Sequence, residues 1–273
     1  MLEINKIHQG DCLELMKNIS DKSINLIICD LPYGIHSMEW DCEIDLNKLW
    51  EQYNRIIKDD GGIILFSSNS FTHKLALSNL KMYKYDLIWK KSKCGSPFTA
   101  KYMPLKKHET ILIFGKGRIK YFSQLISGEP YKRKWTPNKV NNLKYGIKGV
   151  QTDNKGTRHP TTILDFPQKW RRQDQIHPTQ KPVELIEWLI NSYSEKKDII
   201  LDNTIGSGTT AIACINTDRN FIGIELDKEY FEIAKKRIEK HSQQSSLLPL
   251  AENSKEDGIP PTNKLVGILP KRL

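Results

Sequence analysis

Two short stretches of the sequence place an acidic residue directly after an apolar run. Residues 29–34 read CDLPYG and follow the apolar run 24–28, which predicts a buried strand that ends at Asp30. Residues 200–214 read ILDNTIGSGTTAIAC, where a second apolar strand ends at Asp202, a glycine-rich turn follows and a helix begins near Thr209. Acids placed at the ends of buried strands are candidates for catalysis or ligand binding.

The glycine-rich turn has the composition of a nucleotide-binding loop. Gly206 and Gly208 let the backbone come close to a ligand, and the following helix N-terminus offers free N–H groups. The string GSGTTA also satisfies the loose dinucleotide pattern, and Glu225 ends the next strand, where an acid can bind ribose hydroxyls. This motif alone leaves three interpretations open: NAD-type binding, S-adenosylmethionine binding and a purely structural turn.

The composition is that of an ordinary soluble protein. The 273 residues are 38% hydrophobic and 27% charged, without a signal-peptide h-region or a run of about 18 apolar residues, so we expect a cytoplasmic protein with no membrane contact. The five cysteines are odd in number and never form C-x-x-C, which argues against a disulfide framework or a zinc site. Cys29 is therefore interpreted as a buried strand residue.

The net charge of +10 is concentrated in one segment. Residues 116–175 contain 14 Lys and Arg against four acids, and seven aromatic residues are interleaved with them. This mixture suits phosphate contacts combined with base stacking, although a merely solvated basic face has the same charge. The segment is too long for an ordinary loop and is predicted to be a functional insertion that binds nucleic acid. The candidate nucleic-acid contacts are Lys132, Arg133, Lys134, Arg158, Arg171 and Arg172.

Apolar runs alternate with amphipathic stretches along the rest of the chain, which predicts a mostly parallel α/β sheet. The tail from Ser242 onward is polar and proline-containing and is predicted to be loosely ordered. The predicted strands are 2–8, 24–29, 62–67, 85–90, 110–114, 199–202 and 221–225, and the predicted helices are 46–58, 70–81, 180–194 and 227–241, with one more from Thr209.

Three blocks in a fixed order resemble the amino-group DNA methyltransferases of the permuted β group. They are CDLPYG, the block HPTQKP at 177–182, and D-x-x-x-G-S-G-T-T from Asp202. In that group the catalytic motif precedes the cofactor motif, with the target-recognition region between them. The resemblance covers residues 3–240. The sequence departs from the usual pattern in two blocks: Leu31 stands where D-P-P-Y has its first proline, and Asn203 and Thr204 stand where an aromatic residue is common.

The resemblance implies a fold and a division of the chain. The fold is the Rossmann-like methyltransferase fold, with a mostly parallel seven-stranded sheet and an inserted target-recognition region. Residues 1–115 would form the catalytic half, 116–175 the basic recognition insertion, 176–241 the cofactor-binding half and 242–273 the tail.

The resemblance also assigns roles to residues. Asp30 and the carbonyl of Leu31 would accept the two hydrogens of an exocyclic amino group, while Pro32 shapes the turn and Tyr33 stacks on an extruded base. The cofactor would be S-adenosylmethionine, and no thiol nucleophile is required. Its binding residues would be Asp11, Asp30, Thr179, Gln180, Lys181, Asp202, Thr204, Gly206, Gly208, Thr209, Glu225 and Leu226.

The resulting hypothesis is a sequence-specific methyltransferase that modifies the N6 amino group of adenine in double-stranded DNA. Cytosine N4 is the nearest alternative, since it is the same kind of nitrogen. An RNA or protein amide methyltransferase and a non-catalytic DNA-binding module are alternatives from other classes. A homodimer and a cognate restriction endonuclease are further partners that we consider, and a bacterial or phage origin fits the resemblance.

Overall fold

The computed structural model of the 273-residue chain describes residues 2–33, 44–95, 97–134, 151–167 and 180–247. Among the predicted site residues, Thr179, Arg171 and Arg172 lie outside these ranges, as does most of the predicted tail. The chain divides into two compact units, which are described separately. The first contains the described residues of Met1–Gln124 and Thr161–Leu247, and the second those of Leu125–Pro160.

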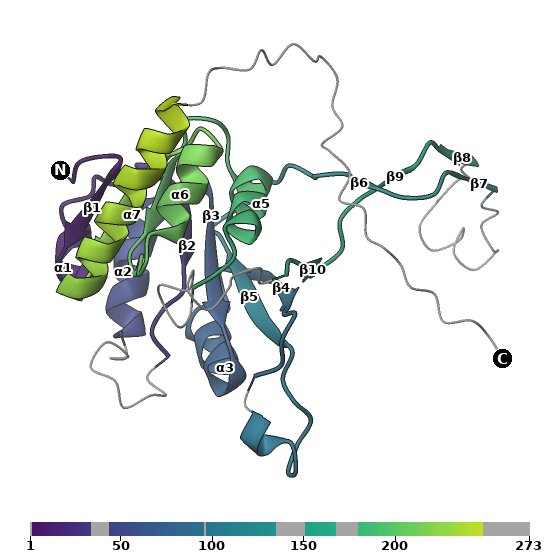
Figure 1. Cartoon of the computed structure of the whole chain (residues 1–273), viewed down its shortest axis with the longest axis horizontal. Coiled ribbons are helices and arrows are strands. Elements are labelled where there is room, and N and C mark those ends of the chain that lie inside the picture. The colour runs from purple at the N-terminus through teal and green to yellow at the C-terminus, as the bar shows by residue number, and fades with distance from the viewer. Residues whose placement is uncertain (1, 34–43, 96, 135–150, 168–179, 248–273) are drawn as a thin grey trace. The chain divides into compact units, whose positions relative to one another are not determined.

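A central sheet organises the first unit, with eight strands among the described residues in the order β1-β12-β11-β2-β3-β5-β4-β10 (Figure 1). Neighbouring strands are parallel except that β5 runs antiparallel to both β3 and β4. The strands are β1 (Lys6–Gln9), β2 (Ile24–Cys29), β3 (Ile57–Ser67), β4 (Tyr83–Lys90), β5 (His108–Phe114), β10 (Ile163–Asp165), β11 (Ile199–Asp202) and β12 (Asn220–Glu225).

Helices cover both faces of this sheet. β2 is buried at every residue, as expected for a central parallel strand whose two faces are both covered. One core joins the sheet to α1, α2 and α3, and a second joins it to α5 and α6, with α7 packed beside α6 and β1 (Figure 1). The helices are α1 (Cys12–Met16), α2 (Leu46–Ile56), α3 (Asn69–Ser78), α5 (Val183–Tyr193), α6 (Thr209–Asn216) and α7 (Lys228–Leu247).

Most predicted elements are confirmed, and two strands, 24–29 and 199–202, match residue for residue. The first predicted strand is wrong over 2–5, because Asn5 has a positive φ of 62° and β1 begins only at Lys6. The helix predicted to reach residue 58 ends at Ile56, because Ile57 is already extended and begins β3. α7 continues to Leu247, six residues beyond the predicted end.

The predicted sheet lacked one strand. The short strand β10 pairs in parallel with β4 and makes the observed sheet eight-stranded within the described residues, where seven strands were expected. Three residues give too little periodicity to predict a strand, and β10 is held by pairing of Ile163 with Ile88 and by burial of Leu164. The short helix α1 was likewise not predicted.

The second unit is built from two small antiparallel pairs. β6 (Ile126–Ser127) pairs with β9 (Thr157–Arg158), and β7 (Tyr131–Lys134) pairs with β8 (Gln151–Asn154). None of these short strands was predicted, because the segment is polar and has no clear period. Among the helices that the structure describes in the chain, none is long and apolar enough to cross a membrane.

A buried hydrogen bond ties α2 to the end of β11. The hydroxyl of Tyr53, which is fully buried, donates to Oδ1 of Asn203 at 2.5 Å. Tyr53→Phe removes this donor from a water-free site, so we expect the free energy of unfolding to fall by about 1–3 kcal/mol in urea denaturation. Tyr83→Phe is the matched control, because its hydroxyl bonds to Asp86 on a strand near the surface. Equal losses in both variants would contradict this interpretation.

Candidate active site

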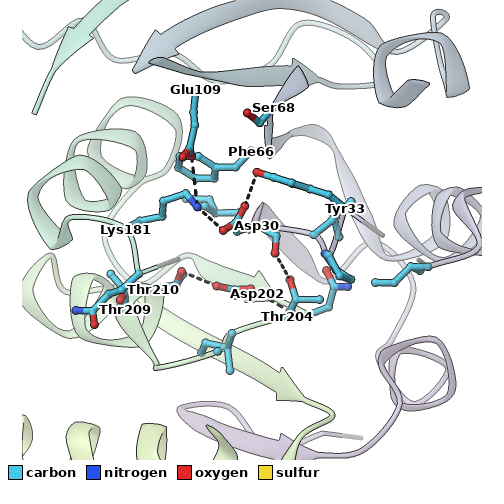
Figure 2. A pocket seen from close by; sticks show the side chains of 18 of the residues that line it. Asp30, Tyr33, Phe66, Ser68, Glu109, Lys181, Asp202, Thr204, Thr209 and Thr210 are labelled. Atoms are coloured by element: carbon cyan, nitrogen blue, oxygen red, sulfur yellow. Dashed lines mark hydrogen bonds and ion pairs between the residues drawn. The ribbon is translucent and has the colours of Figure 1, made fainter. Parts of the chain in front are cut away.

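Four parallel strands end side by side and bring their terminal residues together. β12, β11, β2 and β3 are neighbours, and the residues at or just after their C-terminal ends include Glu225, Asp202, Asp30 and Ser68. All four line one cavity of about 860 Å³. Ligand crevices in open α/β sheets lie at this edge, so the cavity is the candidate active site (Figure 2).

Asp30 is held by three different neighbours at this edge. Its Oδ1 accepts a hydrogen bond from the Tyr33 hydroxyl at 2.9 Å, and its Oδ2 makes an ion pair with Nζ of Lys181. Its backbone carbonyl accepts a hydrogen bond from the Thr204 hydroxyl at 3.2 Å. Figure 2 shows two of these contacts at the carboxylate and the third at the backbone of the same residue. The carboxylate is therefore fixed in orientation at the wall of the cavity.

The lysine that pairs with Asp30 belongs to a buried chain of charges. The Lys181 side chain is only 9% exposed, and its ammonium also lies 3.5 Å from Oε2 of Glu109 and 5.1 Å from the centre of the Phe66 ring. Burial lowers the pKa of Lys181, but the carboxylates of Asp30 and Glu109 outweigh burial and the net pKa is raised. Lys181 therefore stays protonated.

Glu109 continues this chain toward Lys91. Its Oε1 accepts from Nζ of Lys91 at 2.6 Å. Burial raises the pKa of the Glu109 carboxyl, whereas Lys181 and Lys91 together bring it below its ordinary value. Glu109 is thus ionised, and the order Asp30, Lys181, Glu109, Lys91 alternates in charge. The sequence offered no signal for Glu109, because it lies inside β5 and in none of the motifs.

The side of the cavity formed by β11 is organised around Asp202. Its Oδ2 accepts from the Thr210 hydroxyl at 2.5 Å, and its Oδ1 accepts from the backbone N–H of Thr204 at 3.2 Å. Burial dominates over these bonds and raises the pKa of Asp202 to about 7. The carboxyl is therefore poised between its two protonation states near neutral pH.

Glu225 stabilises the glycine-rich turn through its carboxylate. It accepts from the backbone N–H of Gly206 at 2.8 Å and from that of Asp227 at 3.0 Å, while burial raises its pKa. Gly206 has a φ of +53° and open space where a side chain would project. Gly208 has a φ of +81° and lies against Ala234 and Ile238, so both glycines meet the conformational requirement of the turn.

Four further predicted cofactor residues line the cavity, whereas Gly208 is not in its lining because it faces α7, and Thr179 lies outside the described residues. Asp11 caps α1 by accepting from the N–H of Glu14 at 3.1 Å, and Leu226 is 57% exposed. The Thr209 hydroxyl accepts from Arg237 at 3.1 Å, so it contributes to the packing of α7. Gln180 is buried beside Lys181. The structure brings together, in one cavity, Asp11, Asp30, Leu31, Pro32, Tyr33, Gln180, Lys181, Asp202, Thr204, Gly206, Thr209, Glu225 and Leu226.

Cys29 does not face this cavity as a nucleophile. It is 1% exposed, its Sγ lies 2.8 Å from Oδ1 of Asn203, and burial raises the pKa of its thiol well above the ordinary value. The prediction of a buried strand residue is confirmed. Asn203, which departs from the usual aromatic residue, is 2% exposed, lines the cavity and accepts from both Cys29 and Tyr53.

The basic residues of the second unit have unequal roles. The guanidinium of Arg158 lies 4.5 Å from the Tyr131 ring and bonds to Asn154 and to the Glu129 carbonyl, so it holds the unit together. Lys132, whose side chain is 79% exposed, lies 3.4 Å from Asp153, and Arg133 is exposed. Lys134 belongs to β7.

The fold and the cavity together define an α/β protein with a nucleotide-type crevice and an acid-x-Pro-Tyr turn in the same site. The model of the N6 and N4 type DNA methylase family matches residues 24–236. The chain belongs to this family, and it is a site-specific DNA methyltransferase that acts on an exocyclic amino group.

Individual relatives agree with this assignment. The chain is similar to the Type II methyltransferases M.BglII of Bacillus subtilis (30% identical, covering 85% of this chain and 68% of the relative) and M1.MboII of Moraxella bovis (28%; 84% and 95%). Among solved structures it resembles the M1.HpyAVI–SAM complex, with 26% identity, a TM-score of 0.56 and coverage of 85% of this chain and 98% of that chain. PvuII DNA methyltransferase (cytosine-N4-specific), at 18% identity, TM-score 0.61 and coverage of 87% and 89%, shares the fold.

The raised pKa of Asp202 predicts a pH-dependent stability. Between about pH 4 and 7 the folded protein retains a proton on Asp202 that the unfolded chain has released. As pH rises through this window, the ionisation of Asp202 therefore lowers the free energy of unfolding, by on the order of 4 kcal/mol. The experiment is urea denaturation of Asp202→Asn and of the parent chain, without added ligand. The free energy of unfolding of the variant minus that of the parent chain should increase with pH.

Asp218→Asn provides the control for this experiment. The ion pair with Lys197 lowers the pKa of Asp218, so its contribution is present above the unfolded pKa and is lost as pH falls. The difference curve of Asp202→Asn should therefore rise between about pH 4 and 7, whereas that of Asp218→Asn should stay level in this window and change in the opposite direction only at lower pH. Parallel curves would show that Asp202 is ionised in the folded protein.

Proposed function

We propose that the chain transfers a methyl group from S-adenosylmethionine to the N6 amino group of adenine at a specific DNA sequence, after the base is flipped out of the helix. The observation that carries this proposal is the position of Asp30. Its carboxylate lies in the same cavity as Asp202, Glu225 and the open turn at Gly206. A reacting amino group and a nucleotide-like cofactor can therefore meet in one enclosed space.

The cavity has the features that this cofactor needs. Its volume of about 860 Å³ lies in the range of small-molecule sites. The carboxylates of Asp202 and Glu225 supply acceptors for a ligand with ammonium and hydroxyl groups, and the open space at Gly206 allows close approach to the backbone. When bound, S-adenosylmethionine supplies an activated methyl group attached to a positively charged sulfur.

Asp30 acts as an acceptor and orienting group in this proposal. The lone pair of an exocyclic amino nitrogen is delocalised into the ring, so the nitrogen must be drawn toward tetrahedral geometry before it attacks. The Asp30 carboxylate and the Leu31 carbonyl each accept a hydrogen bond from one of its two N–H groups. These bonds point the lone pair of the nitrogen at the methyl donor. The Tyr33 hydroxyl and the Lys181 ammonium already bond to the carboxylate, so it need not reorganise.

Tyr33 supports the extruded base. Its ring packs on Phe71 with centroids 4.9 Å apart and an interplanar angle of 32°, which fixes the ring while it lines the cavity. A fixed aromatic face gains about 1–3 kcal/mol by stacking on a base. Pro32 restricts the turn that presents this ring.

Cytosine N4 is the competing target, and PvuII DNA methyltransferase, which shares the fold, is cytosine-N4-specific. An aspartate at the start of the catalytic turn supports adenine, because the cytosine enzymes of the resembled group more often begin it with serine. The exposed Lys132 and Arg133 of the second unit support a role for residues 125–160 in target recognition. The names of the Type II relatives support a cognate restriction endonuclease.

The product and the catalytic residue can be tested together. We expect DNA from a host that expresses the chain to contain N6-methyladenine at one recurring sequence, detected by nucleoside analysis and by sequencing of methylated bases. Asp30→Ala should lower methyl transfer at least about 100-fold, because the amino group loses its oriented acceptor. Asp218→Ala, which removes an exposed carboxylate paired with Lys197 and absent from the cavity lining, is the control and should retain activity. N4-methylcytosine in the product, or methylation by Asp30→Ala at the rate of the parent chain, would overturn the assignment.

Glu109 is proposed as a positioning residue that acts through Lys181. Glu109→Gln removes one of the carboxylates that raise the pKa of Lys181, while the burial that lowers this pKa remains. We therefore expect the alkaline limb of the kcat profile to move to lower pH. Glu195→Gln, at an exposed ion pair with Lys120, is the control. A reduced kcat with an unmoved pH profile would mean that Glu109 supports only the packing of the site.

A further inference from the structure

The connection between β4 and β5 forms an ordered arm. We define the arm as residues 91–95 and 97–107. Its two sides continue the hairpin, with the N–H of Lys91 donating to the carbonyl of Lys107 and that of Gly95 donating to the carbonyl of Lys106, both at 2.9 Å. Its tip is a short 3₁₀ turn, Pro97–Thr99. Figure 1 shows this connection reaching beyond the ends of β4 and β5.

The tip of the arm exposes large apolar side chains. Phe98 is 93% exposed, Tyr102 is 85% exposed and Met103 is 59% exposed. A neighbouring backbone bond, from the N–H of Met103 to the carbonyl of Thr99 at 3.0 Å, gives these side chains a defined frame. Aromatic rings held in water on an ordered element are typical of a surface that binds a partner.

The charge of the arm selects the kind of partner. Residues 91–107 contain five lysines and no acid. Lys91 pairs with Glu109, and Lys106 donates to Asn69 at 3.0 Å, so these two are engaged near the cavity. Lys93, Lys101 and Lys107 are exposed and make no ion pair with the carboxylates that the structure describes. Lysines that alternate with exposed aromatic rings fit a polynucleotide, which offers phosphates and stacking bases.

The arm also borders the candidate active site. Gly95, Thr99, Met103 and Pro104 line the same cavity as Asp30. A base that enters this cavity remains attached to its strand, so the nucleotides on either side of it must pass close to the cavity rim. The arm is therefore placed to contact the DNA that flanks the target base.

We propose that the arm is a second DNA-binding surface, separate from the basic segment 116–175. Lys93, Lys101 and Lys107 bind phosphates, while Phe98 and Tyr102 stack on bases next to the one that is flipped. This proposal rests on the DNA methyltransferase activity and adds a contact that the three sequence motifs do not contain. It favours DNA over a protein partner, because a protein partner would not require a purely basic arm.

The lysines are tested by the salt dependence of DNA binding. The probe is sheared, whole-genome-amplified DNA, which carries no methyl groups, and binding is followed by fluorescence anisotropy. For Lys93→Gln/Lys101→Gln/Lys107→Gln, we expect the slope of log K against log salt to become shallower by about 2 to 3. Lys235→Gln/Lys236→Gln/Lys240→Gln, three exposed positions on α7, is the matched control. Replacement of the three arm lysines by arginine should restore the parent slope.

The aromatic tip is tested by methyl transfer to the same DNA. For Phe98→Ala/Tyr102→Ala, we expect the DNA concentration at half-maximal rate to rise at least about fivefold, with the salt slope unchanged. Leu77→Ala/Leu80→Ala removes two other exposed apolar side chains and is the control. Phe98→Trp should keep the parent behaviour, because it retains a stacking face. Binding of S-adenosylmethionine by each variant, measured by calorimetry, shows that the cavity is intact.

The possible outcomes distinguish a failure of the DNA-binding arm from a failure of the proposed methyltransferase function. If the parent chain methylates the DNA and both arm variants match their controls within twofold in slope and rate, the arm does not bind DNA. If the variants instead change the oligomeric state without changing DNA kinetics, the arm is a protein interface and the inference is wrong. If the parent chain transfers no methyl group to adenine, the proposed function fails, whereas the anisotropy slopes still test the arm.

Discussion

The contact between Asp30 and Lys181 determines how the site is assembled. Two opposite charges are removed from water together, and a buried charge that loses its partner destabilises the structure strongly. The two residues are far apart in the sequence, in the segments before and after the basic insertion. Their pairing therefore requires that β2, which leads to Asp30, and the segment that leads into α5 be folded against each other. The same contact thus joins the parts of the chain that we propose to be catalytic and cofactor-binding.

The sheet order explains why motifs so distant in sequence form one site. β2 and β11 are adjacent and parallel, so the acids that follow or end them, Asp30 and Asp202, emerge at the same edge. The hydroxyl of Thr204 then reaches the Asp30 carbonyl at 3.2 Å and links the two strand ends directly. Permutation changes the order in which the motifs follow one another along the chain. It does not change the fact that β2 and β11 are neighbours in the sheet.

The parts of the site that sequence reasoning found are those with local signals. Asp30, Asp202 and Glu225 could be placed because each ends an apolar run, and glycines mark the turn. Glu109 could not be placed, because its role depends on β5 lying between β3 and β4 and on the register of that pairing. The arm had a visible composition of lysines and aromatics, but its position at the cavity rim follows only from how the β4–β5 hairpin is extended. Short strands such as β10 depend on pairing across the chain and have no period of their own.

The residues just before and just after the second unit belong to the first unit and are held by contacts within it. Gln124, just before it, donates to the Trp188 carbonyl and to the Ser192 hydroxyl, both at 2.7 Å, and β10, just after it, is paired with β4. Both ends of the intervening segment are therefore held by contacts that do not involve the segment itself. Its sequence can diverge, or be exchanged by recombination for another of similar length, while the chemistry of the sheet edge is inherited unchanged. With the proposed role of this unit in target recognition, new sequence specificities can in this way evolve without changes to the sheet edge.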